Sequence, residues 1–167
     1  MKTLLFVSIS LILISCNHST SDDKLAKGTF AIYLLQDPTI TAGDAFSQPI
    51  ESLKLSTSSF LTVNDLKLYV WSTHAFELTE QTKTMFDKFK LTQGKTTGVP
   101  FIVTVGNDRI YLGTFWWAYS SSTPPACAVI DVDLLLPYRI QLANGAVDKR
   151  SDSRIYYSLT ISGVLVE

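Results

Sequence analysis

The sequence predicts an α+β or mainly β domain, built as an antiparallel sheet or a sandwich-like pair of sheets with one short helix at about residues 80–90. From residue 28 onward, apolar residues recur mostly at every second position, which is the period of a half-buried strand. A single segment has apolar residues at helical spacing, and the absence of repeated strand-helix alternation argues against a doubly wound fold. The charged fraction of 17% lies below the roughly 25% typical of soluble proteins, which indicates either extensive β-structure or an adhesive surface.

The expected strands begin with an alternating run in which Phe30, Ile32 and Leu34 share one face. Gly106-Asn107-Asp108 separates two later apolar runs, and because these residues tolerate a positive φ, the two runs are expected to form a hairpin. In chain order, the expected strands are residues 30–35, 66–71, 74–78, 99–105, 109–117, 127–132, 139–142 and 154–165.

The expected helix follows Thr79, whose side chain can cap its start, and Glu80 suits the positive end of the helix dipole. Met85, Phe86 and Phe89 share one face of this helix, which continues through residue 90. Residues 44–46 are expected to add a single helical turn.

The chain begins with the three parts of an export signal. Lys2 supplies the positive charge, residues 4–14 form an apolar run, and Ser15 is the small residue at the cleavage point. The run is too short to span a bilayer, because a helix needs about 20 apolar residues to cross it. We therefore expect a signal peptide at residues 1–15, a polar flexible tether at residues 16–27 and one globular domain at residues 28–167.

The residues around the expected cleavage point, Leu13-Ile14-Ser15-Cys16, resemble the lipobox of bacterial lipoproteins. This resemblance implies that the Cys16 sulfur receives a diacylglyceryl group, that cleavage occurs just before it, and that the new amino terminus is acylated, with palmitate as a typical chain. Asn17 is not the Asp that retains such lipoproteins in the inner membrane. The implied location is therefore the cell envelope, with the outer membrane, periplasmic or surface-facing, favoured over the inner membrane. The alternative is an ordinary secretory signal in which Cys16 is incidental.

Composition excludes several functional classes. The 14 Lys and Arg are matched by 15 Asp and Glu without a basic run, so nucleic acid is not an expected partner. The nucleotide-binding glycine loops, the G-x-S-x-G elbow and the H-E-x-x-H zinc motif are missing from the sequence, and we expect no cofactor and no metal site. With Cys16 lipidated, Cys127 is the single remaining thiol, and its apolar surroundings favour a buried residue.

Two residue pairs could support catalysis. Cys127 and His74 are the only thiol and histidine after the tether, and a nucleophilic thiol needs a nearby base. Asp131 and Asp133 share one face of their strand and could act as an acid and a base or bind Ca²⁺, although solvated strand-end carboxylates are the commoner explanation. His74 and Glu77 cannot share a metal ion on a strand, because residues three apart point to opposite faces.

The aromatic segment at residues 111–125 is the candidate binding site. If its strand persists, Trp117 and Tyr119 lie on one face together with Tyr111 and Phe115, and Trp116 points to the other. Aromatic rings next to a Ser- and Pro-rich loop can stack on a glycan or anchor a peptide or an envelope protein, so Trp116, Trp117 and Tyr119 are the candidate ligand-binding residues. The alternative is that these rings fill the core.

A second resemblance covers about residues 64–130. Pro100 to Val103, Arg109 to Trp116 and Val129-Ile130, together with Asp65-Leu66, His74 and Leu78-Thr79, resemble a run found in uncharacterised bacterial envelope lipoproteins. It implies a single coherent domain and brings no known activity.

The sequence therefore predicts a lipid-anchored bacterial cell-envelope protein that binds a partner through the aromatic-rich loop, with no catalytic residues. The alternative is an envelope hydrolase that uses Cys127 and His74, or the paired carboxylates. The first hypothesis expects an exposed Trp116, Trp117 or Tyr119 and a Cys127 far from His74. The second needs Cys127 and His74 within hydrogen-bond reach.

Overall fold

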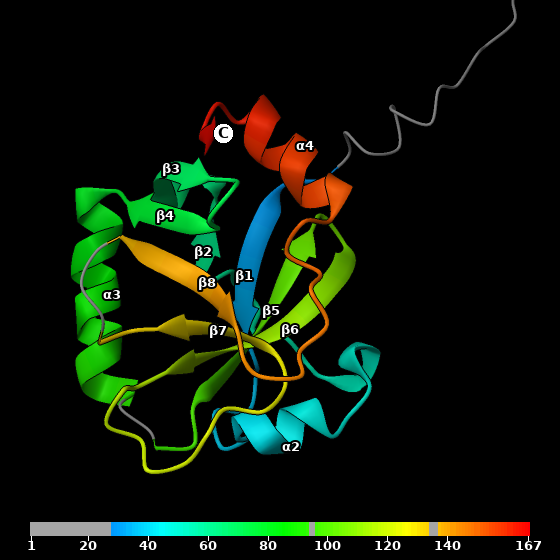
Figure 1. The fold of residues 1–167 in the computed structure, drawn as a ribbon, viewed down its shortest axis with the longest axis vertical. Coiled ribbons are helices and arrows are strands. Elements are labelled where there is room, and N and C mark those ends of the chain that lie inside the picture. The colour runs from blue at the N-terminus through cyan, green and yellow to red at the C-terminus, as the bar shows by residue number, and fades with distance from the viewer. Residues whose placement is uncertain (1–27, 94–95, 134–136) are drawn as a thin grey trace, which may run out of the picture.

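The computed structural model describes residues 28–93, 96–133 and 137–167. The expected signal peptide, tether and lipidated Cys16 lie outside these residues. A nine-stranded sheet dominates the fold, in the order β2-β1-β5-β6-β7-β8-β4-β3-β9 (Figure 1). The expectation of a mainly β domain is confirmed.

The strands mostly match the alternating runs of the sequence. Their bounds are β1 Phe30–Leu34, β2 Leu61–Thr62, β3 Leu66–Val70, β4 Ala75–Leu78, β5 Val99–Val105, β6 Asp108–Trp116, β7 Ala128–Asp131, β8 Tyr138–Leu142 and β9 Leu165–Val166. The predicted hairpin is confirmed as β5 and β6, with Gly106 at a φ of 59° in the turn.

The sheet is mixed rather than purely antiparallel, which corrects the expected arrangement. β6 runs parallel to β7, and β3 runs parallel to β9, whereas the other neighbours are antiparallel. The parallel β6–β7 pair arises because residues 117–127 carry the chain back along β6 to the level of Gly113, where β7 begins at Ala128. Such a connection leaves no alternating pattern in the sequence, and period-two reasoning cannot detect it.

The helices and turns are α2 Ala42–Phe46, α3 Glu80–Gln93, α4 Ser153–Ile161 and the 3-10 turns η1 Ile50–Ser52 and η2 Val63–Asp65. The helix expected at 80–90 is confirmed as α3, with Phe86 and Phe89 buried and Met85 more exposed. The strand expected at 154–165 is wrong. Asp152 caps α4 by accepting a hydrogen bond from the Arg154 N–H at 2.9 Å, and within the expected range only Leu165 belongs to a strand, β9. Among the described helices, none combines the length and the apolar character needed to cross a bilayer.

The central strands are buried on both faces. Phe101 and Phe115 point into the largest core cluster, beneath α3, where Phe86 and Phe89 pack against the Phe115 ring at centroid distances of 5.6 and 5.1 Å. Ile102 points to the opposite face, where the α2 and η1 segment covers it. This double cover accounts for the nearly continuous apolar sequence of β5 and β6.

The sheet curls, so that strands far apart in its order approach each other. Phe30 of β1 and Tyr69 of β3 line the same small internal cavity. α4 lies where these two parts of the sheet meet, since its Ser158 hydroxyl accepts a hydrogen bond from the Phe30 N–H at 2.7 Å while Ile155 and Leu159 enter the core.

Candidate binding pocket

The aromatic segment divides between the core and the surface. Trp117 is 1% exposed in the main core, and Trp116 is 8% exposed and packs on the opposite face of the sheet with Ala42 and Val129. The predicted opposite orientation of the two tryptophans is therefore confirmed, but neither indole is available as a flat surface for a ligand. Tyr119 is 60% exposed and is the one member of the predicted trio at the surface.

Tyr119 borders an open groove between the aromatic segment and α3, together with Asp87, Lys90 and Asp133. The Lys90 ammonium is held by the Asp87 carboxylate at 2.8 Å and lies 3.4 Å from the Tyr138 hydroxyl. The groove therefore offers one aromatic ring and a few carboxylates, with its cation already paired.

Cys127 and His74 are not brought together. Strand β8 lies between them, because Ile140 donates its N–H to the His74 carbonyl and Ala143 donates its N–H to the Cys127 carbonyl, each at 3.0 Å. Given the usual strand spacing and rise, two strand spacings across and three residues along place the two backbones about 14 Å apart. Burial raises the pKa of the Cys127 thiol to about 11, so the thiol is protonated and weakly nucleophilic at neutral pH.

His74 lies in the turn before β4 rather than at the start of the strand, which corrects the expected range 74–78. Its φ of 52° places it in the left-handed region, and it is 6% exposed. The ring nitrogen Nδ1 lies 3.0 Å from the Tyr69 hydroxyl. Burial, followed by the charge of Arg150, lowers the pKa of His74, so the imidazole is neutral at pH 7 and serves as a packing residue.

The carboxylates of Asp131 and Asp133 both accept hydrogen bonds from backbone N–H groups. Asp131 accepts a hydrogen bond from the Asp133 N–H at 3.0 Å, and Asp133 accepts one from the Ala118 N–H at 3.0 Å. Both bonds shape the chain at the end of β7. In the part of the chain that the structure describes, no group of three or more His, Cys, Asp or Glu is arranged to hold a metal ion.

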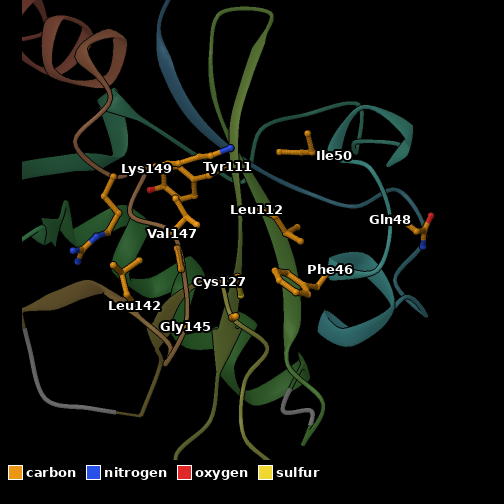
Figure 2. Close-up of a pocket in the computed structure, with 13 residues that line it drawn as sticks. Phe46, Gln48, Ile50, Tyr111, Leu112, Cys127, Leu142, Gly145, Val147 and Lys149 are labelled. Carbon is orange, nitrogen blue, oxygen red and sulfur yellow. The ribbon is translucent and has the colours of Figure 1, made fainter.

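A pocket of about 340 Å³ opens where β6 and β7 separate. The two strands pair only from Gly113 and Ala128 onward, so the preceding residues Leu112 and Cys127 diverge and leave a gap in the sheet. Figure 2 shows Phe46 on the α2 side of this gap and Val147 on the opposite side, with Leu112 and Cys127 between them.

The walls of the pocket are mainly apolar. Phe46, Leu112, Cys127, Leu142 and Val147 contribute carbon and sulfur surface. Phe46 and Val147 are apolar residues, yet 47% and 78% of their surfaces are exposed. Each stands in a polar stretch of the sequence. Exposed apolar side chains that face each other across a concave site are typical of ligand pockets rather than of ordinary surface.

Polar and charged residues also line the pocket, among them Tyr111, Lys149 and Arg150. The Arg150 guanidinium is held by two hydrogen bonds to the Asp148 carboxylate, at 2.9 and 2.8 Å, and donates a third to the Ile140 carbonyl. Lys149 has no ion-pair partner among the described residues, so one positive charge is left for a ligand. The Tyr111 hydroxyl makes no hydrogen bond within the same part of the chain, and burial raises its pKa well above the usual value, which keeps it a proton donor.

Sequence reasoning singled out Cys127 and the segment that contains Tyr111 and Leu112, but it missed the α2 side of the pocket and the residues after β8. The available signal was the pair of isolated apolar residues, Phe46 and Val147, inside the polar stretches that follow β1 and β8. These two stretches line the same pocket only because β6 and β7 diverge, and nothing in the sequence predicts that divergence. No family model, curated protein or solved structure matches this chain.

Proposed function

We propose that this chain is a lipid-anchored protein of the bacterial cell envelope, with a domain that binds a ligand and performs no catalysis. The lipobox-like Leu13-Ile14-Ser15-Cys16 supports the anchor, and the outer membrane is the favoured location because Asn17 replaces the inner-membrane retention residue. Stable anchoring would come from two or more acyl chains on the mature amino terminus.

The binding site is the pocket between β6 and β7, and the single observation that supports this assignment is its chemistry. The lining of this apolar gap also includes Lys149, which forms no ion pair within the described residues, and Tyr111, whose hydroxyl makes no hydrogen bond within them. The ligand class that fits has an apolar body and one negatively charged group, since each part then meets its complement. A volume of about 340 Å³ accommodates a small amphiphile or the end of an acidic peptide.

A titration with the amphipathic anion 1-anilinonaphthalene-8-sulfonate tests the site. Native protein is expected to bind one equivalent with enhanced fluorescence. Val147→Asp places a negative charge in the pocket, which repels the anionic probe, and is expected to weaken its binding at least tenfold. Lys149→Gln removes a positive charge and is expected to weaken binding by about three- to tenfold. Leu91→Asp, at an 87% exposed apolar residue outside the pocket, is the matched control. Equal affinity in native protein and Val147→Asp would exclude this pocket.

The aromatic loop remains a second candidate site because Tyr119 is exposed beside Asp87 and Asp133. A tyrosine ring next to carboxylates is a common arrangement for stacking on a sugar. Pull-down of envelope glycans and proteins with native protein and with Tyr119→Ala tests this role. Identical partner lists from the two proteins would remove Tyr119 from the site.

The anchor has its own test. Mass spectrometry of the mature amino-terminal peptide is expected to show a diacylglyceryl thioether on Cys16, and Cys16→Ser is expected to leave the membrane fraction. An unmodified Cys16, or a Cys16→Ser protein that still fractionates with membranes, would contradict the anchor while leaving the pocket untouched.

A further inference from the structure

The outward face of α4 carries two large exposed apolar residues beside the polar Ser153 and Thr160. The inward side of α4 buries Ile155 and Leu159. On the opposite side, Tyr157 and Ile161 stand one turn apart, with 38% and 68% of their surfaces exposed. An ordinary amphipathic helix on a soluble domain keeps this side polar, so the exposed pair points to a partner.

Neighbouring side chains extend this surface. The Trp71 ring packs edge-on against the Tyr156 ring at a centroid distance of 5.1 Å, and Tyr156 contacts the Tyr157 ring at 6.0 Å. Val166 in β9 is 49% exposed, and its carbonyl accepts a hydrogen bond from the Trp71 N–H. We call Trp71, Tyr156, Tyr157, Ile161 and Val166 the α4 face. It occupies one end of the molecule, beside the C-terminus (Figure 1).

The chain enters the domain at the same end. The Phe30 N–H donates to the Ser158 hydroxyl at 2.7 Å, so the start of β1 lies directly against α4. Eleven residues, 17–27, connect Cys16 to Gly28, and a polar linker of that length has a root-mean-square span of about 20 Å. A lipid anchor on Cys16 would therefore hold this end of the domain close to the membrane surface.

We propose that the α4 face lies on the lipid surface of the membrane that carries the anchor. This inference rests on the lipidation of Cys16 in the proposed function. Tyrosine and tryptophan rings favour the boundary between headgroups and acyl chains, because their apolar bodies and polar tips are solvated there together. The contact would add a second point of attachment and so orient the domain on the membrane.

The charges around the α4 face indicate that lipid charge is not the attraction. Arg154 at the start of α4 is paired with Asp152 at 2.8 Å and with Asp108 at 3.2 Å. Glu167 accepts a hydrogen bond from the Tyr156 hydroxyl at 3.0 Å. Since the face offers no unpaired cation among the described residues, we expect docking on zwitterionic lipid with little dependence on salt.

Trp71 provides a built-in reporter. The mature lipidated protein is reconstituted into phosphatidylcholine vesicles that contain lipids brominated on their acyl chains, which quench nearby indoles. Trp71 is expected to be quenched, whereas the buried Trp116 and Trp117 are not. Trp71→Phe is therefore expected to abolish the quenching. Equal emission in brominated and ordinary vesicles would overturn the inference.

A double variant tests the face itself. Tyr157→Ser with Ile161→Ser changes only exposed side chains and is expected to reduce Trp71 quenching at least twofold, with Leu91→Ser as the matched control at a distant exposed apolar residue. Unchanged quenching in a folded double variant would overturn the inference. A second result would also overturn the inference: sedimentation in detergent that shows a dimer of the native protein and a monomer of the double variant. The α4 face would then bind a second copy of the chain.

The two proposals fail in different ways. If mass spectrometry finds no lipid on Cys16, the anchor fails and the docking fails with it. If Cys16 is lipidated and the protein floats with the vesicles while Trp71 stays unquenched, only the docking is wrong.

Discussion

Trp117→Ala is the substitution that most directly separates a core role from a binding role in the aromatic segment. Trp117 is 1% exposed, and the centroid of its ring lies 6.1 Å from the centroid of the Phe89 ring inside the main core. Replacing a buried Trp or Phe by Ala removes transfer free energy and leaves a cavity, at a cost of about 3–5 kcal/mol. Because a domain is stable by only about 5–15 kcal/mol, this one change is expected to remove a large share of the free energy of unfolding.

The assay is urea unfolding followed by far-ultraviolet circular dichroism, which does not depend on the deleted indole. With a slope near 2 kcal/mol per molar urea, the midpoint of Trp117→Ala is expected to fall by about 2 M. Tyr119→Ala, at a 60% exposed position, is the control and is expected to stay within about 0.5 kcal/mol of the native protein. A loss below about 1 kcal/mol in Trp117→Ala, or an equal loss in both variants, would refute this division of the aromatic segment.

Three further predictions follow from burial and charge. Burial raises the pKa of the Cys127 thiol to about 11, so Cys127 is expected to react with iodoacetamide about 100-fold more slowly in the folded protein than in urea at the same pH, as followed by mass spectrometry. Equal rates would contradict its burial. Burial and the charge of Arg150 lower the pKa of His74 below its usual value of 6.5. Because the unfolded chain then binds more protons than the folded one, the free energy of unfolding is expected to fall as the pH drops from 7.5 to 5, and His74→Asn is expected to reduce this pH dependence. A native protein without this pH dependence would contradict the assignment. A methyl group at Gly113 would clash with the end of the Phe101 ring, so Gly113→Ala is expected to cost about 1–3 kcal/mol in thermal unfolding, with partial recovery when Phe101→Leu is added. An unchanged melting temperature would speak against this contact.

The β5–β6 hairpin and α3 could be predicted from the sequence because their information is local. Gly106-Asn107-Asp108 marks the turn between two apolar runs, and Phe86 and Phe89 repeat at helical spacing. Period and turn chemistry are enough to define such elements.

α4 was predicted as a strand because local and tertiary signals disagree there. Ile155, Tyr157, Leu159 and Ile161 alternate in the sequence as on a strand, and their β-branched and aromatic side chains favour one. The buried set in the structure is instead Ile155, Ser158 and Leu159, at helical spacing. The Asp152 cap and the packing of α4 at the junction of the curled sheet outweigh the local preference.

The binding pocket could not be predicted for a related reason. The pocket exists because β7 pairs with β6 only from Gly113 and Ala128 onward, and because α2 and the residues after β8 border the gap before this point. Each of these events joins segments far apart in the chain, so no window of sequence contains the site.

The two outermost strands of the sheet, β2 and β9, have only two residues each. Long unpaired margins would offer a row of free N–H and C=O groups on which another chain could add a strand. Margins this short give an incoming chain very few backbone partners. The brevity of β2 and β9 therefore limits edge-to-edge pairing between copies of the chain.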